Sequence, residues 1–326
     1  MSIRATNRLF IYFFTKDMLY RMDMKIISYR ELTNKNDLLP LMCLAFGWPF
    51  NYQEFEEIAR IDPRLKDSPI GFCALEDDKV VGFAGVVDLT TKILEGRIEN
   101  AGGVWGVAVL PTHARKGIST ALMKTAHEYF SDNDYRFSFL TTSQSMIAYN
   151  FYRKLGYDDA IEFPSSYKFV EKKPSRKREK ENELDLEKIA KLYDDFTTDK
   201  TGIVVRDENY LKILYKREKI KPEMILLDKS GYAIFKNEGK LLRIKEIVAT
   251  SIEETKKLIR SLEHKAKQVV YDTMILDGKT LKSYESLKYN IHKRSYGLIM
   301  VKQLTKNVTF KQVYGENFYT TSLDWF

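Results

Sequence analysis

Three residues of a short basic loop have the chemistry to bind a phosphate group. The loop contains Arg115, Lys116 and Gly117 and follows residues 104–110, an apolar run that is rich in β-branched side chains and stops at a proline. Such a run predicts a buried strand, and the helical spacing of apolar residues after the loop predicts a helix. The first N–H groups of a helix have no partner and carry a partial positive charge. Together with two cations and a glycine that lets a ligand approach the backbone, they form a candidate diphosphate site.

The same pattern also occurs in strand-loop-helix units that bind no ligand. The two common nucleotide fingerprints, G-x-x-x-x-G-K-[ST] and G-x-G-x-x-G, do not occur in the sequence. On this pattern alone, a phosphate site and a plain structural turn are both open.

The stretch from Trp105 to Met123 resembles motif A of the GCN5-related N-acetyltransferases (the GNAT superfamily). In that motif a strand ends in V-x-P, and an [RQ]-x-x-G-x-[GA] loop holds the diphosphate of acetyl-coenzyme A (acetyl-CoA). The matching positions are Val109, Pro111, Gly117, Ile118, Ala121 and Leu122. Ala114 stands where Arg or Gln is usual, and Ser119 stands where Gly or Ala is usual. Because the loop still carries two cations, we expect it to retain cofactor binding.

The form Pro-Thr-His-x-Arg-x-Gly, residues 111–117, is more specific than the general motif A pattern. It resembles the enhanced-intracellular-survival (Eis) branch, whose members carry two acetyltransferase-like domains in one chain. The resemblance implies that the pantetheine arm lies against the strand backbone and the diphosphate against the loop. The residues it implies in cofactor binding are Val107, Ala108, Val109, Arg115, Lys116, Gly117, Ile118, Ser119, Thr120 and Ser145. An unpaired strand edge suits an extended amide chain, because its backbone groups can bind the amides.

A second motif, at residues 143–157, resembles motif B of the superfamily, usually N-x-x-A-x-x-[LF]-Y-x-K-x-G-[FY]. The matching residues are Ala148, Phe151, Tyr152, Lys154, Gly156 and Tyr157. Ser145 replaces the asparagine of the motif. The spacing of Ser145, Tyr149 and Tyr152 predicts that they share one helix face, and Gly156 predicts the helix end.

Acyl transfer from a thioester to an amine needs a base for the amine, donors for the oxyanion and an acid for the sulfur. A tyrosine hydroxyl suits the last role, because its pKa is near that of a thiol. Tyr152 occupies the position of the family's acid; the alternative is that it only hydrogen-bonds the cofactor. Tyr149 is a second candidate, and a backbone N–H near Val107 is the expected oxyanion donor. His113 belongs by position to the phosphate loop, so we do not expect it to be the base.

The chain ends in an aromatic segment, residues 318–326, which predicts a packed strand or plug. In Eis-like enzymes the terminal carboxylate reaches the active site and can act as the base, so the resemblance implies this role for the carboxylate of Phe326. Those relatives supply the carboxylate from a third, sterol-carrier-like domain. The residues after Val301 are too few to form that domain.

Composition limits the class of protein. A chain of 326 residues with 44% hydrophobic and 30% charged residues predicts two globular domains. The net charge is +8, but we find no compact basic and aromatic motif, so we interpret the charge as solvation and attraction for an anionic cofactor. Cys43 and Cys73 are the only cysteines, which favours a reducing compartment. With four scattered histidines, no metal site is expected.

We divide the chain into an N-terminal extension (1–23), a GNAT domain that binds acetyl-CoA (24–170), a mixed-charge linker (171–182) and a degenerate GNAT-like domain with an aromatic tail (183–326). The expected fold class is α/β, with a mixed sheet in each domain. The basic residues of the linker also resemble a nucleic-acid patch, but its glutamates favour a solvated tether. In the second domain, residues 249–254 replace the basic loop, and Glu253 and Glu254 would repel a diphosphate.

The elements expected before the basic loop are a strand over 24–30, helices over 37–46 and 52–60, a hairpin of 70–75 and 80–87, and a strand from 98. Gly102 and Gly103 in the last strand predict either a bulge or a close backbone approach. Trp48 and Phe50, between the two helices, either line the acceptor pocket or pack between the helices.

The sequence therefore predicts a cytoplasmic N-acetyltransferase that moves an acetyl group from acetyl-CoA to a primary amine by direct attack, with Tyr152 as general acid. The expected acceptor is a small molecule, with no nucleic-acid or membrane partner, and a homo-oligomer is compatible with the pattern. Two alternatives are acetylation of protein or peptide amines, and a non-catalytic sensor or adaptor that binds acyl-CoA.

Overall fold

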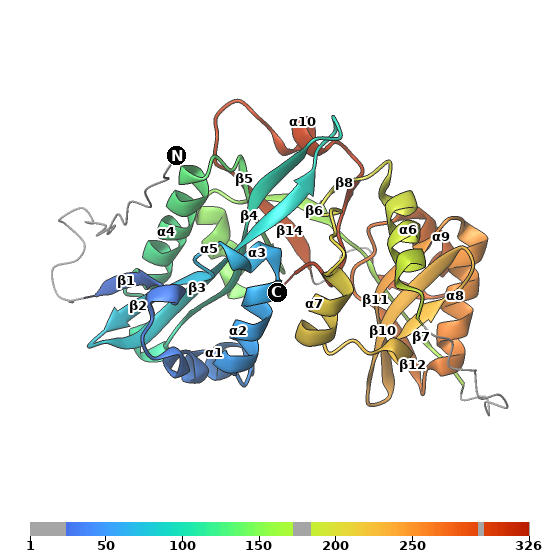
Figure 1. The fold of residues 1–326 in the computed structure, drawn as a ribbon, viewed down its shortest axis with the longest axis horizontal. Coiled ribbons are helices and arrows are strands. Elements are labelled where there is room, and N and C mark those ends of the chain that lie inside the picture. Colours follow the sequence, from blue (N-terminus) through green and yellow to red (C-terminus); the bar gives the residue numbers. More distant parts are fainter. Residues whose placement is uncertain (1–23, 172–183, 293–296, 326) are drawn as a thin grey trace, which may run out of the picture.

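The computed structural model describes residues 24–171, 184–292 and 297–325. Two lobes lie side by side along the longest axis, one built mostly from the N-terminal half and one mostly from the C-terminal half (Figure 1). The expected extension 1–23, nearly all of the linker 171–182 and Phe326 fall outside the described residues. Within those ranges, no helix is long and apolar enough to cross a membrane.

The first lobe is built on a mixed sheet with the strand order β1-β2-β3-β4-β5-β14-β6. These strands are β1 (Lys25–Ser28), β2 (Gly71–Glu76), β3 (Lys79–Lys92), β4 (Ile98–Val109), β5 (Phe137–Thr142), β14 (Leu298–Gln303) and β6 (Asp158–Glu162). Neighbours in this order run antiparallel, except that β4 and β5 run parallel.

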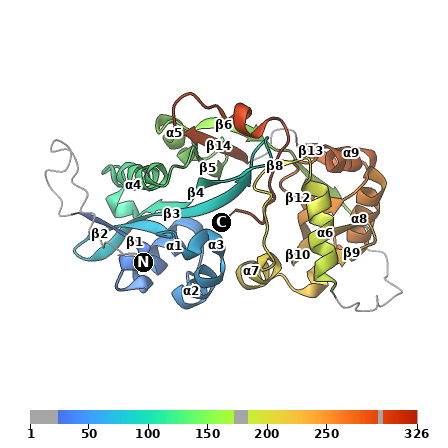
Figure 2. The ribbon, with the colours of Figure 1, turned by 45° about the horizontal axis from the view of Figure 1, so that its top comes forward.

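Helices cover both faces of this sheet (Figure 2). One face carries α1 (Leu38–Phe46), α2 (Tyr52–Ile61) and α3 (Pro63–Lys66), and the other carries α4 (Ile118–Asp132) and α5 (Ile147–Lys154). Side chains alternate along a strand. Trp105 and Phe139 accordingly join the core under α1–α3, whereas Val104 and Leu140 join the core under α4. The mixed sheet between two helical layers confirms the predicted α/β class.

The second lobe contains a mixed sheet with the order β13-β7-β12-β11-β10-β9. Its strands are β13 (Asn290–His292), β7 (Ser165–Phe169), β12 (Val269–Asp272), β11 (Leu241–Ala249), β10 (Gly231–Glu238) and β9 (Ile225–Leu227). Its helices are α6 (Leu186–Thr197), α7 (Tyr210–Arg217), α8 (Ile252–Lys265) and α9 (Gly278–Ser286). The unit β11-α8-β12, with its parallel strands, repeats β4-α4-β5 of the first lobe.

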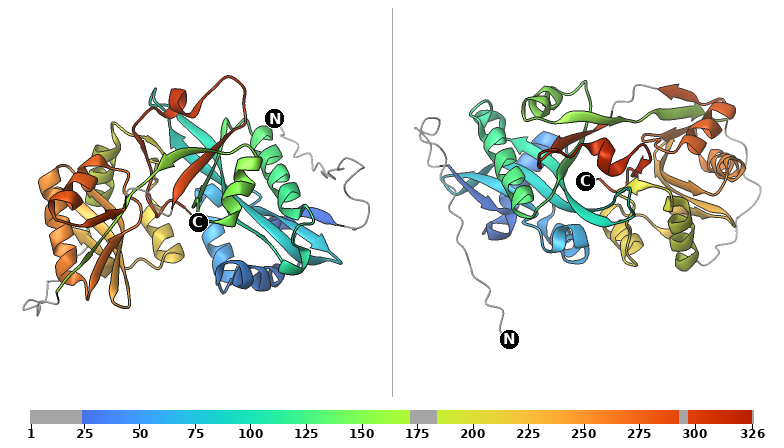
Figure 3. Two further views of the ribbon diagram at one scale, coloured as in Figure 1. Left: turned by 180° about the vertical axis from the view of Figure 1, so that it is seen from behind. Right: turned by 90° about the horizontal axis from the view of Figure 1, so that it is seen from above.

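The two lobes exchange one strand each. β7 follows β6 in the chain but pairs with β12 and β13 of the second sheet. β14 comes from the end of the second half and inserts between β5 and β6 of the first sheet. The chain from β6 to β7 therefore runs from one lobe to the other (Figure 3). The expected boundary at residues 171–182 divides the sequence, but the sheets do not follow it.

The C-terminal segment returns across both lobes. It forms α10 (Phe310–Tyr314) and β15 (Phe318–Tyr319), which pairs with β8 (Thr201–Gly202). The ring of Phe318 stacks on that of Phe139, with centroids 5.8 Å apart, and Tyr314 packs against both Phe137 and Phe139. Phe318 belongs to the core of the first lobe and Tyr319 and Leu323 to a core cluster of the second, so the predicted packing of the aromatic tail is confirmed.

Gly102 and Gly103 of β4 allow a close approach of neighbouring side chains. A Cβ atom on Gly102 would lie 2.4 Å from the ring of Phe130 on α4, and one on Gly103 would lie 2.5 Å from Val87 on β3. Of the two expectations for this glycine pair, the close approach is confirmed, whereas the bulge of this strand lies at Gly106 and Val107.

We expect Gly102→Ala to lower the free energy of unfolding by about 2–3 kcal/mol, because the added methyl group must displace Phe130 from a packed core. Gly278→Ala is the matched control, since a Cβ atom there meets no atom within 4 Å. Its free energy of unfolding should change by less than ~1 kcal/mol. Urea unfolding followed by circular dichroism measures both, and equal midpoints for the two variants would contradict the packing argument.

Candidate active site

A gap opens between the two parallel strands of the first sheet. β5 pairs with β4 only at Gly102 and Gly103 within the described chain. β4 continues to Val109 and β5 to Thr142, so the two strands diverge beyond that point. The backbone edge of β4 along residues 104–109 is therefore free to bind an extended amide chain.

A bulge in β4 lies directly at this gap. Gly106 has φ 59°, and Gly106 and Val107 together stand opposite the single residue Ala84 of β3. A left-handed residue of this kind favours glycine. Bulges redirect the strand and leave one residue outside the regular ladder. Val107, the expected source of the oxyanion donor, is thus at the irregular point of the strand.

The basic loop leads into the open N-terminus of α4. Gly117 occupies the N-cap with φ 82° and has no side chain that could cap the helix. The first intrahelical bond runs from the Ala121 N–H to the Gly117 carbonyl (3.0 Å), so the N–H groups of the first turn remain free for a ligand. Arg115 also has a left-handed φ of 62°. Arg115, Lys116 and Gly117 are exposed.

Both ring nitrogens of His113 have a hydrogen-bond partner. Its Nε2 lies 2.5 Å from the Glu76 carboxylate, and its Nδ1 lies 2.8 Å from the Thr112 hydroxyl. Both ring nitrogens are therefore used in fixing the loop to the end of β2. That His113 is not the base stays a prediction.

Tyr152 lies on α5 and is packed against the core beneath α4. Burial raises its pKa to about 12, so the hydroxyl is protonated at neutral pH, the form in which a general acid acts. Its ring meets the ring of Tyr157 edge to face at 5.9 Å. Tyr157 is itself fixed by the Ser138 hydroxyl (2.7 Å) and by His127 Nε2 (2.9 Å). No protein partner for the Tyr152 hydroxyl occurs in the described part of the chain.

Tyr149 and Ser145, the other two polar residues singled out in motif B, make hydrogen bonds of their own. Tyr149 donates its hydroxyl proton to Asp159 (2.9 Å) at the surface. Ser145 lies before the helix, which begins at Ile147, because Met146 has an extended backbone (φ −84°, ψ 142°). The prediction that Ser145 shares a helix face with the two tyrosines is therefore wrong. Its hydroxyl instead lies 2.8 Å from that of Ser143.

A cavity of about 350 Å³ lies at the carboxyl end of β5, between the lobes. Thr141 and Thr142 of β5, Phe163 after β6, Thr273 after β12 and Trp325 of the tail contribute to its lining. Three separate parts of the chain thus meet at the carboxyl end of β5: the first lobe, the second lobe and the C-terminal segment.

A buried ionic network holds the C-terminal segment beside this cavity. The Asp324 carboxylate accepts hydrogen bonds from the Tyr210 hydroxyl (2.8 Å) and the Thr321 N–H (2.7 Å), and lies 3.5 Å from the Arg206 guanidinium. Arg206 also pairs with the buried Glu246. A paired buried charge is costly to disrupt, because removing one partner leaves the other uncompensated.

Two further arginines hold the backbone of the same segment. Arg64 of α3 donates to the Asp324 carbonyl (2.7 Å), and Arg217 of α7 donates to the Leu323 carbonyl. Asp62 binds Arg64 through both oxygens (2.9 and 2.7 Å) and lies 3.7 Å from Arg217. This network was not predicted from the sequence. The only signals for it were the charged residues Asp62 and Arg64 on either side of Pro63, and Asp324 in an otherwise aromatic tail.

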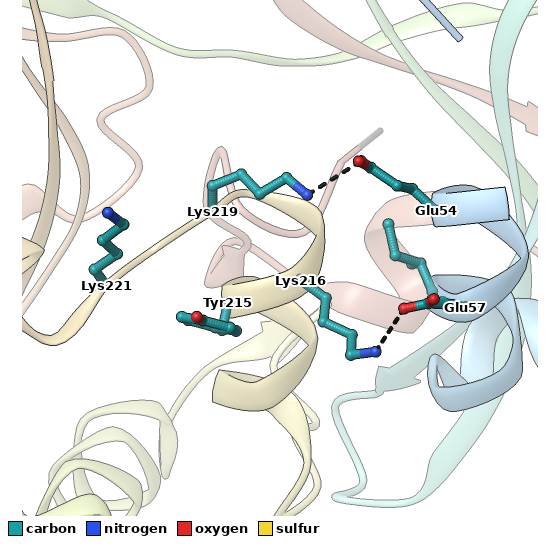
Figure 4. A pocket seen from close by; sticks show the side chains of 7 residues that line it. Glu54, Glu57, Tyr215, Lys216, Lys219 and Lys221 are labelled. Atoms are coloured by element: carbon teal, nitrogen blue, oxygen red, sulfur yellow. Dashed lines mark hydrogen bonds and ion pairs between the residues drawn. The ribbon is translucent and has the colours of Figure 1, made fainter. Parts of the chain in front are cut away.

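A second, smaller cavity lies across the lobe boundary between α2 and α7 (Figure 4). Lys219 pairs with Glu54 (3.1 Å) and Lys216 pairs with Glu57 (2.9 Å). It shares no described lining residue with the cavity at β5. Exposed pairs of this kind contribute little to stability, and we do not assign this groove to the reaction.

The two aromatic residues between α1 and α2 act mainly in packing. Phe50 is buried, and Trp48 packs against Phe50, Phe55 and Trp105 with ring centroids 5.2 to 6.4 Å apart. Trp48 also lines a cavity of about 170 Å³ next to the α2–α7 groove, but it does not line the cavity at β5. Packing therefore accounts for both residues, and a role of Trp48 in the acceptor pocket stays a prediction.

The second lobe lacks an open helix end at the equivalent place. The hydroxyl of Ser251 caps α8 by accepting from the Glu254 N–H (3.3 Å), and Glu253 and Glu254 occupy the first turn. Negative side chains at this position complement the helix dipole and repel an anion. The contrast with Gly117 supports one diphosphate site, in the first lobe.

Comparisons with known proteins agree with this geometry. Residues 28–160 match a family model described as an acetyltransferase (GNAT) domain. A GCN5-related N-acetyltransferase from Kribbella flavida is similar with a TM-score of 0.61 at 18% identity, over 86% of this chain and 72% of that one. A putative acetyltransferase from Pyrococcus horikoshii has a TM-score of 0.55 at 15% identity, over 93% and 97%. A search of curated proteins found no match.

A third similar structure is the N-myristoyltransferase from Saccharomyces cerevisiae with bound myristoyl-CoA. Its TM-score is 0.57 at 11% identity, over 86% of this chain and 82% of that one. At these identities the likeness concerns the fold. Because each match covers 86% of the chain or more, the shared fold includes the second lobe as well as the first.

Proposed function

We propose that this chain, whose residues 28–160 match a GNAT acetyltransferase domain, transfers an acetyl group from acetyl-CoA to a primary amine. The GNAT fold supports acyl transfer from an acyl-CoA; the acetyl donor and the amine acceptor are the proposal. The observation that carries it is the uncapped N-terminus of α4, with Arg115 and Lys116 beside it, at one end of the β4–β5 gap. The two-lobed architecture agrees with the tandem arrangement that the Eis-like resemblance implies.

The residues of the gap suit a donor of this shape. The diphosphate would bind the free N–H groups that follow Gly117, and the pantetheine amides would bind the edge of β4 between Val107 and Val109. The thioester would then lie near the bulge at Gly106, within reach of α5. In this binding mode the expected cofactor residues of β4 and of the basic loop contact the donor, and Ser145 does not.

The reaction would proceed by direct attack. The amine nitrogen forms a bond to the thioester carbon, and a backbone N–H near Val107 stabilises the oxyanion. The carbon–sulfur bond then breaks, and Tyr152 donates its proton to the departing thiolate. Tyr152 is suited to this step because burial keeps its hydroxyl protonated and the surrounding rings hold it in place.

For the base we propose the terminal carboxylate, that of Phe326. Its support is the position of the residue before it: Trp325 lines the cavity at β5, and residues 320–324 are held by the ionic network around Asp324. The second candidate function, a non-catalytic acyl-CoA sensor, would use the same gap but would need neither Tyr152 nor the carboxylate. We place the protein in the cytoplasm, in keeping with its two free cysteines, Cys43 and Cys73.

The donor site is tested by calorimetry with acetyl-CoA. We expect one site per chain, and at least about tenfold weaker binding in Arg115→Ala/Lys116→Ala, because two phosphate-binding cations are lost. Arg153→Ala/Lys154→Ala, which removes two exposed cations from α5, is the charge-matched control and should bind as wild type does. Two sites per chain would mean that the second lobe also binds the donor, and tighter binding of myristoyl-CoA would show that acetyl is not the natural acyl group.

The acid is tested with Tyr152→Phe. Turnover should fall about 100-fold, the usual contribution of a general acid, while the Kd for acetyl-CoA changes less than ~3-fold. Tyr149→Phe is the control on the same helix, and its turnover should remain near that of wild type. Unchanged turnover in Tyr152→Phe would leave this residue as a binding contact only, and no turnover by the wild-type chain with any amine would favour the sensor.

The base is tested at the last residue of the chain. Deleting Phe326 moves the terminal carboxylate back by one residue, so turnover should fall about 100-fold or more. Phe326→Ala keeps the carboxylate at its place in the chain and should retain most of the turnover. Equal turnover by the two variants, both folded by circular dichroism, would exclude the carboxylate as base.

A further inference from the structure

The carboxyl end of α5 is closed by a capping motif that involves Tyr152 directly. The N–H of Tyr157 donates to the Tyr152 carbonyl (3.1 Å), and the N–H of Gly156 donates to the Arg153 carbonyl (3.0 Å). Gly156 has the left-handed φ, 86°, that this motif requires. The ring of Tyr157 also packs edge to face on that of Tyr152, with centroids 5.9 Å apart. Tyr157 therefore contacts the proposed acid through both its backbone and its side chain.

The hydroxyl of Tyr157 connects this cap to two other elements. It lies 2.7 Å from the Ser138 hydroxyl on β5 and 2.9 Å from Nε2 of His127 on α4. Tyr157 and Ser138 are fully buried, and polar groups in such a place need hydrogen-bond partners. A phenylalanine would keep the backbone bond and the ring contact, so the cap itself does not depend on the hydroxyl. What the hydroxyl adds is the attachment of α5 to β5 and to α4.

Both partners of this hydroxyl belong to elements that border the donor gap. Ser138 stands opposite Gly102 of β4, at the closed end of the gap between β4 and β5. His127 lies nine residues after Ile118, the first residue of α4, which corresponds to about 14 Å along the helix axis. The uncapped N-terminus of α4 is the proposed diphosphate site. One hydroxyl thus fixes the helix of the acid relative to the strand and the helix that would hold the donor.

The contact between Tyr157 and His127 is constant across the neutral pH range. Burial, with a smaller contribution from the Lys302 ammonium, lowers the pKa of His127 to about 4. Burial also raises the pKa of the Tyr157 hydroxyl, so neither partner titrates near pH 7. Lys302, on the exchanged strand β14, donates in addition to the Leu155 carbonyl at the end of α5. The same end of α5 is therefore held from α4, β5 and β14.

From these contacts we propose that Tyr157 and His127 are positioning residues for Tyr152. They set the place of the acid relative to the N-terminus of α4, where the diphosphate of the donor would bind. The pantetheine arm has a limited covalent length, so the thioester sulfur meets the acid only when this separation is correct. A misplacement of about 1 Å can lower a rate about 100-fold. The inference rests on the proposed function and adds to it two residues that act through Tyr152.

The hydroxyl is tested with Tyr157→Phe in the full-length chain. Turnover is measured with acetyl-CoA and with the amine that the wild-type chain acetylates fastest among tyramine, spermidine and a lysine-containing peptide. We expect kcat to fall about tenfold, because Tyr152 is less well placed. The KM for acetyl-CoA should change less than ~3-fold, because the N-terminus of α4 is unaltered.

Tyr129→Phe is the matched control. It removes from α4 a hydroxyl that donates to Asp88 of β3 (3.1 Å), and its kcat should remain near that of wild type. A kcat of Tyr157→Phe equal to that of Tyr129→Phe would overturn the proposal.

A pair of variants at position 127 tests the second positioning residue. His127→Leu removes the partner of the Tyr157 hydroxyl on α4, whereas His127→Gln keeps a side-chain amide that can hydrogen-bond it. We expect His127→Leu to lower kcat at least about threefold and His127→Gln to retain most of it, because only the former releases α5 from α4. An equal kcat of the two variants would overturn the role of His127.

A double-mutant cycle separates positioning from a purely structural role. If the hydroxyl acts through Tyr152, the variant Tyr152→Phe/Tyr157→Phe should turn over as fast as Tyr152→Phe alone, because the acid to be positioned is already absent. If the hydroxyl only stabilises the fold, the second substitution should lower kcat by the same factor in both backgrounds, and the proposal is overturned. Circular dichroism at the assay temperature checks that each variant is folded.

The same measurements distinguish this inference from the proposed function. Full turnover by Tyr157→Phe beside a loss in Tyr152→Phe would support the function and overturn the positioning role. A loss in Tyr157→Phe beside full turnover by Tyr152→Phe would also overturn that role, since the hydroxyl would then act without the acid. Absence of turnover by the wild-type chain with all three amines would overturn the function and the inference together.

Discussion

The buried carboxylate of Asp324 is the interaction on which the position of the C-terminal segment between the two lobes depends. It brings together Arg206 and Tyr210 of the second half with the turn of the C-terminal segment. Arg206 is also stacked between the rings of Tyr193 and Tyr210, at 3.6 and 4.0 Å. An aspartate in such a place is tolerated only when it is fully paired. Most of residues 320–324 are consequently buried and hydrogen-bonded in the manner of a core element.

The exchange of strands makes the two lobes one folding unit. Without β14 the first sheet would lose the strand between β5 and β6, and without β7 the second would lose the strand between β12 and β13. The cavity lies where these exchanged strands begin and end, since Ser165 opens β7 and Gly297 precedes β14. The second lobe, although its helix α8 has no open end for a diphosphate, therefore contributes part of the wall of this cavity.

The local parts of the site could be predicted from the sequence because they are local in the chain. The strand, the basic loop and α4 follow one another at residues 98–132, and periodicity with one glycine identifies them. The strand exchange and the network around Asp324 join residues more than 100 positions apart, and no short pattern encodes such pairing. The errors at Gly102 and Ser145 have a similar cause, because the position of a bulge or a helix start depends on packing by distant side chains.

The contrast between α4 and α8 shows how two helix N-termini of the same fold can differ in their electrostatic preference for an anion. Each helix connects the two strands of a parallel pair: α4 connects β4 to β5, and α8 connects β11 to β12. In α8 a serine hydroxyl satisfies a first-turn N–H and two glutamates cancel the positive end of the dipole. In α4 a left-handed glycine leaves those N–H groups free, and two cations add to the same potential. The electrostatic preference for an anion therefore reverses between the lobes while the backbone topology is retained. The fold supplies the position, and the cap residues decide whether a diphosphate can occupy it.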